Sequence, residues 1–394
     1  MHRLKNPVQE YAWGSRSAIA KLLGEPVPST KPQAELWMGA HPKAPSLVLL
    51  DVETVALTKW IQRDPRAVLG AAAGSFSNEL PFLFKVLAAG MPLSIQAHPD
   101  IDQAREGFER ENAEGIDISA DRRNYRDPNH KPELICALTP FWALNGFRQP
   151  GEIRTLAGAL GSEGLDALCS CLDGRDGIRR FFSDLMTMAR EPLRTLVRES
   201  VGKARGLADT DPAFDWMVRL SHEFPDDPGV LGPLLLNLVR LEPGQAMALP
   251  ARRLHAYLDG TGMEIMANSD NVLRGGLTVK HVDVPELLRV LSFEPSDPGV
   301  AGPDRTSDVE SVYRSGAREF VLSVISVSSG APFDAPADHG AEILFCTSGS
   351  GRIWEPEADR SLDYGRGDSF IVPAAAGHYQ IAGEATLYRA CVPV

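Results

Sequence analysis

LLLNLVRLEPGQAMALPARRLHAYLDG, Leu234–Gly260, is the stretch that decides the fold class. The turn sequence EPGQ lies between two apolar runs of strand length, and a proline ends the second run. Short apolar runs separated by turn residues are typical of antiparallel sheets. The pattern therefore predicts an antiparallel jelly-roll or cupin barrel.

A second stretch near the C-terminus repeats this pattern. GDSFIVPAAAGHYQI (367–381) and GQAMALPARRLHAYL (244–258) each have Gly, a short apolar run, Pro, a turn and then His. His378 thus stands where His255 stands, which predicts an internal duplication of the barrel unit. The C-terminal copy supplies no partner with ligand spacing, because ILFCTSG (343–349) contains no His-x-His. We therefore expect a second barrel without a metal.

Strands and helices occupy different parts of the chain. Apolar runs such as SLVLL (46–50) and FLFKVLA (82–88) indicate strands in the first 145 residues, with helical spacing at 17–23 and 57–69. Between Glu152 and about Asp226, apolar residues at helical spacing predict four or five short helices. This region contains no constellation that suggests chemistry. The turn-rich sequence FPDDPG, 224–229, ends it.

The expected architecture is mainly β with a helical insertion: two cupin or jelly-roll barrels plus an all-α domain. We expect residues 1–148 and 230–295 to form a first, site-bearing cupin domain, 149–229 a helical domain, and 296–394 a C-terminal cupin-like domain. The charged segment 102–128 fits either an exposed loop after a helix start or a lid over a site.

Composition narrows the class of partner. The 394 residues are 43% hydrophobic and 23% charged, which is ordinary for a globular protein. The net charge of -12 disfavours nucleic acid and anionic membranes as partners. The N-terminus lacks the apolar core of a signal peptide, and no run approaches the roughly 18 apolar residues that span a bilayer. Five irregularly spaced cysteines indicate reduced thiols, so we expect a soluble, cytoplasmic protein.

SIQAHPD, Ser94–Asp100, contains two side chains that can bind a metal. A strand sends residues i and i+2 to one face, so Gln96 and His98 would point into one pocket. Alone this is a weak signal, because a lone His is more often a core or surface residue. Glu133, at the start of an apolar run, and His255 would complete two imidazoles, one carboxylate and one amide. That set suits zinc with an open position, although Gln is an uncommon zinc ligand.

Several cations lie in or beside apolar runs. Lys85, within FLFKVLA, is either a site residue or a strand-edge side chain that reaches water. Lys131 and Glu133 would share a face of a strand, which would put an ammonium close to a metal. A nearby dication lowers the pKa of a Lys and makes it usable as a base. Arg274 and Lys280 follow in SDNVLRGG and LTVKH, and a fixed Arg can stabilise an oxyanion.

Five segments in order resemble the type I mannose-6-phosphate isomerases. They are NPVQEYAWGS (6–15), AELWMGAHPKAPS (34–46), LPFLFKVLAAGMPLSIQAHPD (80–100), DPNHKPELICALTPFWALNGFR (127–148) and LHAYLDGTGMEIMANSDNVLRGGLTVKHVDVPELL (254–288). Five matching segments in one order are highly specific, whereas any one alone would not be. The C-terminal barrel fits the family more loosely.

The resemblance implies a catalytic cupin barrel, a helical domain, a second barrel and one zinc ion that serves to interconvert mannose 6-phosphate and fructose 6-phosphate. The zinc ligands of the family fall on Gln96, His98, Glu133 and His255. The wall of the site falls on Trp13, Glu35, Lys85, Ser94, Lys131, Tyr257, Glu264, Asp270, Arg274 and Lys280. Such enzymes are often monomeric, and the expected partner is a small sugar phosphate.

Three positions beside the site depart from the family pattern. Leu254 stands where the family usually has Pro, Gly275 where it has Ala, and Val279 where it has Pro. These residues flank site residues rather than replace them. The departures bear on loop rigidity and substrate breadth more than on the reaction.

The implied chemistry moves a proton between neighbouring carbons through a cis-enediol. It needs a positioned base and a group that holds charge on the two oxygens. Lys131 is the first candidate for proton transfer, Glu264 the second and Asp270 the third, while Arg274 would steady the enediolate. His98 could act in ring opening only if it is not needed as a ligand.

The remaining wall residues are expected to bind substrate. They are Trp13, Glu35, Lys85, Ser94, Tyr257 and Lys280. Ser94, Lys85 and Lys280 are all candidates for the 6-phosphate, and the sequence does not choose among them.

Two other functions compete with the isomerase. A cupin with these ligands could bind iron and act as an oxygenase. The cluster of Lys and Arg argues against this, because oxygen chemistry has no special need for cations around the metal. A catalytically silent sugar-phosphate sensor is the other alternative. Retention of all four ligands together with Lys131 and Arg274 argues against it.

Overall fold

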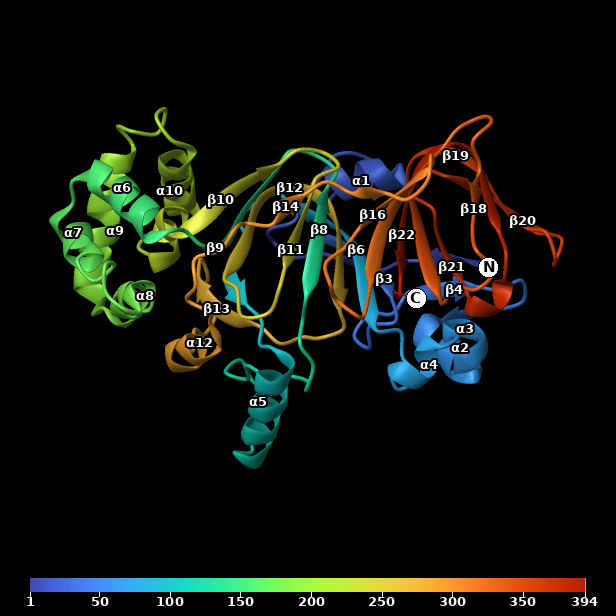
Figure 1. Cartoon of the computed structure of the whole chain (residues 1–394), viewed down its shortest axis with the longest axis horizontal. Coiled ribbons are helices and arrows are strands. Elements are labelled where there is room, and N and C mark those ends of the chain that lie inside the picture. Colours follow the sequence, from blue (N-terminus) through green and yellow to red (C-terminus); the bar gives the residue numbers. More distant parts are fainter. Residues whose placement is uncertain (394) are drawn as a thin grey trace.

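The computed structural model describes residues 1–393, which form two sheets of 11 strands each and a group of helices at one end (Figure 1). Sheet 1 contains β2 (Val8–Gln9), β3 (Glu35–Gly39), β6 (Phe82–Ala89), β7 (Ile95–Ala97), β8 (Glu133–Ala137), β9 (Phe141–Phe147), β10 (Leu236–Leu241), β11 (Ala246–Leu249), β12 (His255–Ala267), β13 (Leu273–Gly276) and β14 (Val300–Ala301).

Sheet 2 collects strands from both ends of the chain. It contains β1 (His2–Lys5), β4 (Leu47–Leu49), β5 (Thr54–Ala56), β15 (Asp304–Arg305), β16 (Glu310–Tyr313), β17 (Val321–Val327), β18 (Phe333–Asp334), β19 (Glu342–Glu355), β20 (Arg360–Gly365), β21 (Ser369–Val372) and β22 (Gln380–Cys391). β1 joins the N-terminal strands to the rest, because it pairs with β21 on one side and with β4 on the other.

This pairing adds detail to the predicted domain limits, which stay predictions. β1, β4 and β5 come from the first 148 residues but lie in sheet 2, whereas β14 comes from beyond residue 295 and lies in sheet 1 beside β11. The chain therefore passes between the sheets more than once.

β12 is the central strand of sheet 1. Its first residues pair with β7 and β9, and its later residues pair with β6 and β8. A register shift between Tyr257 and Asp259 lets one strand serve both sets of partners, because a bulge bends and twists the chain locally. This arrangement sets His255 opposite Gln96 and Glu264 opposite Lys85.

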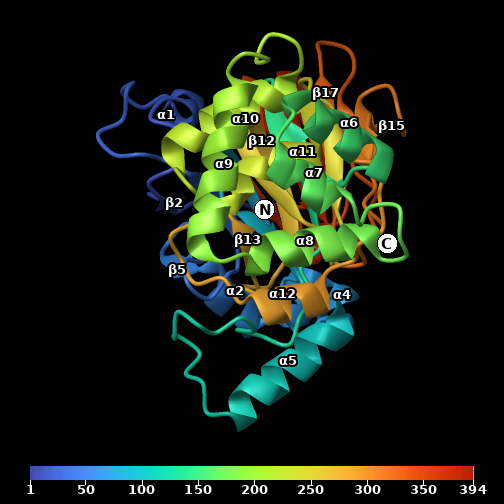
Figure 2. The same cartoon turned by 90° about the vertical axis from the view of Figure 1, so that its left-hand side faces the viewer.

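The predicted central helices are confirmed (Figure 2). They are α6 (Pro150–Leu160), α7 (Glu163–Cys169), α8 (Gly177–Thr187), α9 (Arg190–Ala204) and α10 (Pro212–Glu223), followed by the 3-10 turn η1 (Pro228–Leu231) and α11 (Gly232–Leu235). Their apolar faces form one buried cluster that continues into sheet 1 through residues such as Ile95, Leu144 and Leu254. The helices therefore share a core with the sheet rather than enclosing one by themselves.

The remaining helices include those expected at 17–23 and 57–69 and the helix start expected in 102–128. They are α1 (Ala18–Leu23), α2 (Leu57–Arg63), α3 (Pro65–Leu69), α4 (Ala72–Ser75), α5 (Ile101–Ala113), α12 (Val284–Val290) and the 3-10 turn η2 (Ala374–Ala376). The helical spacing over 57–69 is confirmed, although it forms two helices, because the helix is interrupted at Asp64. Pro65 has no amide hydrogen to continue a helix, and the Asp64 side chain instead caps α3 by accepting from the Ala67 amide at 3.0 Å.

Segment 102–128 begins as α5, which projects from sheet 1 (Figure 1). Its end is anchored, since Arg123 forms an ion pair with Glu111 at 3.0 Å and Tyr125 is fully buried. No residue of 102–128 lines the pocket described below, which favours the loop over the lid. Within residues 1–393, no helix combines the length and apolar character that crossing a membrane requires.

Candidate metal centre

Three side chains meet where β7, β8 and β12 come together. His98 follows β7, Glu133 begins β8, and His255 begins β12. One ligand atom from each lies within 4.8 Å of the others. The Nε2 atoms of His98 and His255 each lie 3.4 Å from a carboxylate oxygen of Glu133, and all three side chains are buried.

Hydrogen bonds fix both imidazoles with the same nitrogen facing inward. His98 Nδ1 lies 2.7 Å from the carbonyl oxygen of Asn271, and His255 Nδ1 lies 3.1 Å from that of Arg253. A carbonyl only accepts, so each Nδ1 carries the proton and each Nε2 presents a lone pair. Burial, followed by the charge of Lys131, lowers the pKa of His98 to about 4, so the ring is neutral at physiological pH.

The inward atoms have no hydrogen-bond partner in the described chain. His98 Nε2, His255 Nε2 and Glu133 Oε2 are all buried and unpaired. Buried polar atoms without partners are costly and rare, so their convergence indicates a missing ligand. Burial alone would raise the pKa of Glu133, but Lys131 and His98 lower it well below its usual value. Two imidazoles and an ionised carboxylate are a donor set that fits Zn²⁺.

Gln96, the fourth predicted ligand, lies beside this group. It sits in β7 opposite His255 of β12 and opposite Arg274 of β13, and it lines the same pocket as Glu133. Its contact with a metal stays a prediction.

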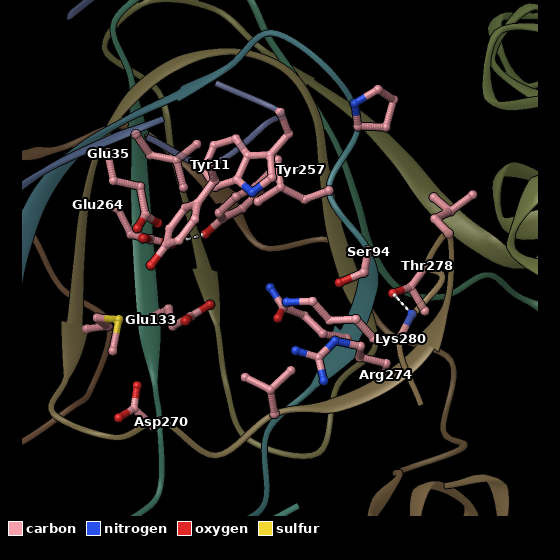
Figure 3. Close-up of a pocket in the computed structure, with 18 of the residues that line it drawn as sticks. Tyr11, Glu35, Ser94, Glu133, Tyr257, Glu264, Asp270, Arg274, Thr278 and Lys280 are labelled. Carbon is pink, nitrogen blue, oxygen red and sulfur yellow. Dashed lines mark hydrogen bonds between the residues drawn. The ribbon is translucent and has the colours of Figure 1, made fainter. Parts of the chain in front are cut away.

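Glu133 of this group lines a pocket of about 570 Å³ (Figure 3). Glu35, Glu264, Tyr11 and Tyr257 gather on one side of this pocket, and Ser94, Arg274, Thr278 and Lys280 gather on the other. The pocket therefore has an acidic and aromatic side and a basic side.

On the acidic side, Lys85 is held between two carboxylates. Its Nζ lies 3.1 Å from Glu35 Oε1 and 2.6 Å from Glu264 Oε2. Burial by itself would lower the pKa of Lys85, but Glu264 and Glu35 more than offset it and raise the pKa above its ordinary value. Lys85 is therefore a permanent cation whose charge is already compensated. Lys85 is thus buried rather than a strand-edge side chain that reaches water, and its role as a site residue stays a prediction.

Besides this ion pair, Glu264 accepts a hydrogen bond from the Tyr257 hydroxyl at 2.7 Å (Figure 3). Burial, together with the charges of Glu133 and Glu35, raises the pKa of Glu264 although Lys85 opposes the shift. Burial likewise raises the pKa of Tyr257, so its hydroxyl stays a donor. A rigidly held carboxylate with a raised pKa is suited to accept and return a proton.

On the basic side, Arg274 and Lys280 have no salt bridge to a carboxylate among residues 1–393. Burial, followed by the charge of Arg126, lowers the pKa of Arg274. Burial, followed by Arg274 and Arg126, lowers the pKa of Lys280, although Asp121 opposes the shift. Adjacent cations without an ion-paired carboxylate favour an anionic ligand.

The other predicted residues take different places around the pocket. Lys131 Nζ lies 2.9 Å from Glu133 Oε1, so it contacts the metal group directly. Asp270 is ion-paired with Lys43 at 2.9 Å and lies apart from Glu264 (Figure 3). Trp13 lines the pocket and its ring lies 5.8 Å from that of Tyr11.

The pocket also contains residues that the predicted site omitted. Trp37 donates to Glu35 Oε2 at 2.8 Å, and His41 Nε2 lies 3.7 Å from Asp270 Oδ2. Tyr11, Trp37 and His41 all lie in the segments NPVQEYAWGS and AELWMGAHPKAPS, so the resemblance could have indicated them. Thr278 gave no signal, because a Thr before an exposed Val has no distinctive pattern.

Comparisons with known proteins agree with this geometry. Residues 1–150 match the model of the family "Phosphomannose isomerase type I, catalytic domain". The mannose-6-phosphate isomerase of Salmonella typhimurium is 40% identical over 394 residues, covering 99% of both chains, and that of Escherichia coli is 40% identical with the same coverage. A zinc-bound crystal structure of a mannose 6-phosphate isomerase aligns with a TM-score of 0.91 at 38% identity, covering 100% of this chain and 99% of the other.

The sequence match extends over essentially the whole of both chains, and the solved structures align along the whole length as well. This chain therefore belongs to the phosphomannose isomerase type I family.

Proposed function

We propose that this chain interconverts mannose 6-phosphate and fructose 6-phosphate, with one Zn²⁺ held by His98, Glu133, His255 and Gln96. The observation that carries the proposal is the convergence of three buried, unpaired ligand atoms on a group whose Glu133 lines the same pocket as Arg274. When bound there, zinc would supply a Lewis acid for the substrate oxygens on C1 and C2.

The basic side of the pocket is suited to hold the substrate anions. Lys280, Ser94 and Thr278 gather there, and they supply one cation and two hydroxyls for the 6-phosphate (Figure 3). Lys85 is a poorer candidate for the phosphate, because Glu35 and Glu264 already take up its charge. Arg274 lies beside Lys280 (Figure 3) and opposite Gln96 of β7, and from there its guanidinium would stabilise the charge of an enediolate.

Proton transfer falls to Glu264 or Lys131. In the proposed reaction a proton leaves C2 of open-chain mannose 6-phosphate, and one returns to C1, through a cis-enediol. Glu264 is favoured, since a hydrogen bond from Tyr257 and an ion pair with Lys85 orient its carboxylate and burial raises its pKa. Lys131 is engaged with the proposed ligand Glu133, and Asp270 with Lys43.

The finer architecture is part of the same proposal. Sheets 1 and 2 would each be a cupin barrel, and α6–α10 a helical domain, which is supported by the repeated Pro-turn-His segments after β11 and β21. We also propose a cytoplasmic monomer that acts on a free sugar phosphate, without nucleic acid or membrane as a partner. The net charge of -12 supports the absence of nucleic acid and anionic membranes as partners.

A coupled assay of mannose 6-phosphate conversion, run on zinc-loaded and on chelator-treated protein, tests the proposal. Turnover should require zinc and return when zinc is restored, with no oxygen uptake. Oxygen consumption by an iron-loaded protein would favour an oxygenase. Binding of mannose 6-phosphate without turnover in the zinc-replete protein would favour a sensor.

A further inference from the structure

The turn FPDDPG, between α10 and η1, touches the pocket wall from the helical side. Phe224 lines the pocket, and Asp227 caps η1 by accepting from the Gly229 amide at 2.7 Å. The same oxygen, Oδ1, accepts from the Leu277 amide at 2.8 Å, and Oδ2 accepts from the Thr278 amide at 3.3 Å. One carboxylate thus joins the end of the helical region to the segment that follows β13.

The backbone at this junction needs such support. Leu277 has a φ of 52° although it is not glycine, a conformation that L side chains rarely adopt. A Cβ on Gly276 would lie 2.9 Å from Gly229 Cα, and a Cβ on Gly229 would lie 2.7 Å from Leu277 N. The two backbones are therefore in direct contact with no room for a side chain between them. Asp227 supplies the hydrogen bonds that hold this contact.

The segment held in this way carries groups of the basic side. Thr278 and Lys280 both line the pocket, and Thr278 Oγ1 accepts from the Lys280 amide at 3.1 Å. Val279, between them, is fully exposed, so its side chain does not pack against the protein and does not help to hold segment 277–280 in place. Leu277, by contrast, is buried in the core shared with the helices. The position of Lys280 therefore depends on the anchor at 277–278.

We propose that Asp227 is a positioning residue that sets the phosphate-binding segment 277–280 and so couples the helical region to substrate affinity. The proposal rests on the assignment of the 6-phosphate to Thr278 and Lys280. Under this proposal the turn FPDDPG contributes to the affinity for substrate, although no residue of the helical region supplies a reacting group. Asp227 acts through backbone amides and does not touch the substrate.

The neighbouring residue provides a matched control. Asp226 has the same charge and lies in the same turn, but its carboxylate accepts from Arg194 at 3.1 Å and from Arg198 at 2.7 Å. It forms no hydrogen bond to 277–280. The variants Asp227→Ala, Asp227→Asn, Asp226→Asn and Lys280→Ala should therefore be compared as zinc-loaded full-length proteins.

The readouts are KM and kcat for mannose 6-phosphate, the inhibition constant of inorganic phosphate, zinc content and melting temperature. We expect Asp227→Ala to raise KM and the phosphate inhibition constant by about tenfold, because small displacements of binding groups are costly. Zinc content should not change, and kcat should fall less than KM rises. Asp227→Asn keeps an acceptor for Leu277 but loses the one for Thr278, so its effect should be smaller and in the same direction. Asp226→Asn should match the unsubstituted protein.

The set separates two kinds of failure. If Lys280→Ala leaves phosphate inhibition unchanged, the phosphate site itself is misassigned. If Lys280→Ala weakens inhibition but neither Asp227 variant does, the site stands and the positioning role of Asp227 is wrong. A lower melting temperature with an unchanged inhibition constant of inorganic phosphate would show that Asp227 contributes to stability and not to phosphate binding. Should Asp227→Ala fail to fold, Asp227→Asn decides the question alone.

Discussion

The buried polar groups of sheets 1 and 2 differ in whether they satisfy one another. In sheet 1, His98, Glu133 and His255 face each other with unpaired atoms. In sheet 2, Arg389 donates to Glu342 at 3.2 Å and to Glu310 at 2.6 Å. The Tyr379 hydroxyl donates to the other oxygen of Glu342. The first cluster is open to a ligand, whereas the second is closed by its own charges.

The two repeated histidines show the same contrast. Each follows a proline by five residues, after β11 for His255 and after β21 for His378. His255 is fully buried and meets Glu133 from β8, whereas the His378 side chain is 35% exposed and lies 3.4 Å from Asp334. A repeated sequence pattern thus does not by itself repeat the site. The residues supplied by the facing strands decide whether a metal can bind.

The largest expected effect follows from removing the carboxylate of the open cluster. Glu133→Ala should lose zinc and lower kcat/KM by more than about 100-fold, since even indirect partners of metal ligands cost 10–100-fold. Metal analysis of dialysed protein and the coupled assay measure both quantities. A variant that retained one zinc per chain would show that Glu133 is not a ligand.

Arg274→Ala should separate chemistry from metal binding. Zinc should remain, because Arg274 is not a ligand, while kcat should fall by about 10²–10³-fold, as when a fixed donor to an oxyanion is removed. Steady-state kinetics on protein of measured zinc content checks this. An unchanged kcat would remove Arg274 from the stabilisation of the enediolate.

In the closed cluster, the corresponding change should affect stability alone. Glu342→Ala leaves Arg389 buried beside only one carboxylate and leaves the Tyr379 hydroxyl without its acceptor. Breaking such a buried pair typically costs roughly 3–5 kcal/mol in the free energy of unfolding. Denaturant unfolding measures that loss, and zinc content and kcat of the folded fraction serve as controls. Loss of zinc in this variant would mean that metal binding in sheet 1 depends on the charged cluster of sheet 2.

The smallest effect is expected at the repeated histidine. His378→Ala should keep one zinc per chain, keep kcat, and change the unfolding free energy by less than about 0.5 kcal/mol, as expected for a partly exposed side chain. The matched substitution His255→Ala should lose zinc. A drop in zinc for His378→Ala would indicate a second metal site in sheet 2.

Local periodicity accounts for what the sequence by itself determined. Alternation predicted the strands around Gln96 and Glu133, and helical spacing predicted the helices of the central region. The residues of the group that could hold a metal, His98, Glu133 and His255, were also singled out in the sequence, because imidazole and carboxylate side chains are the ones that bind zinc. The spacing could not show which nitrogen His98 turns inward, since the carbonyl of Asn271, distant in sequence, sets that choice.

The tertiary structure decided which groups compensate one another. Lys85 could have bound phosphate by its sequence, yet the register of β6 against β3 and β12 places it between Glu35 and Glu264. The pairing of β1 with β21 and the hydrogen bonds of Asp227 to 277–278 likewise join segments far apart in the chain. A residue pattern reports the preferences of neighbours along the chain, whereas register and ion pairing are set by the packing of the whole molecule.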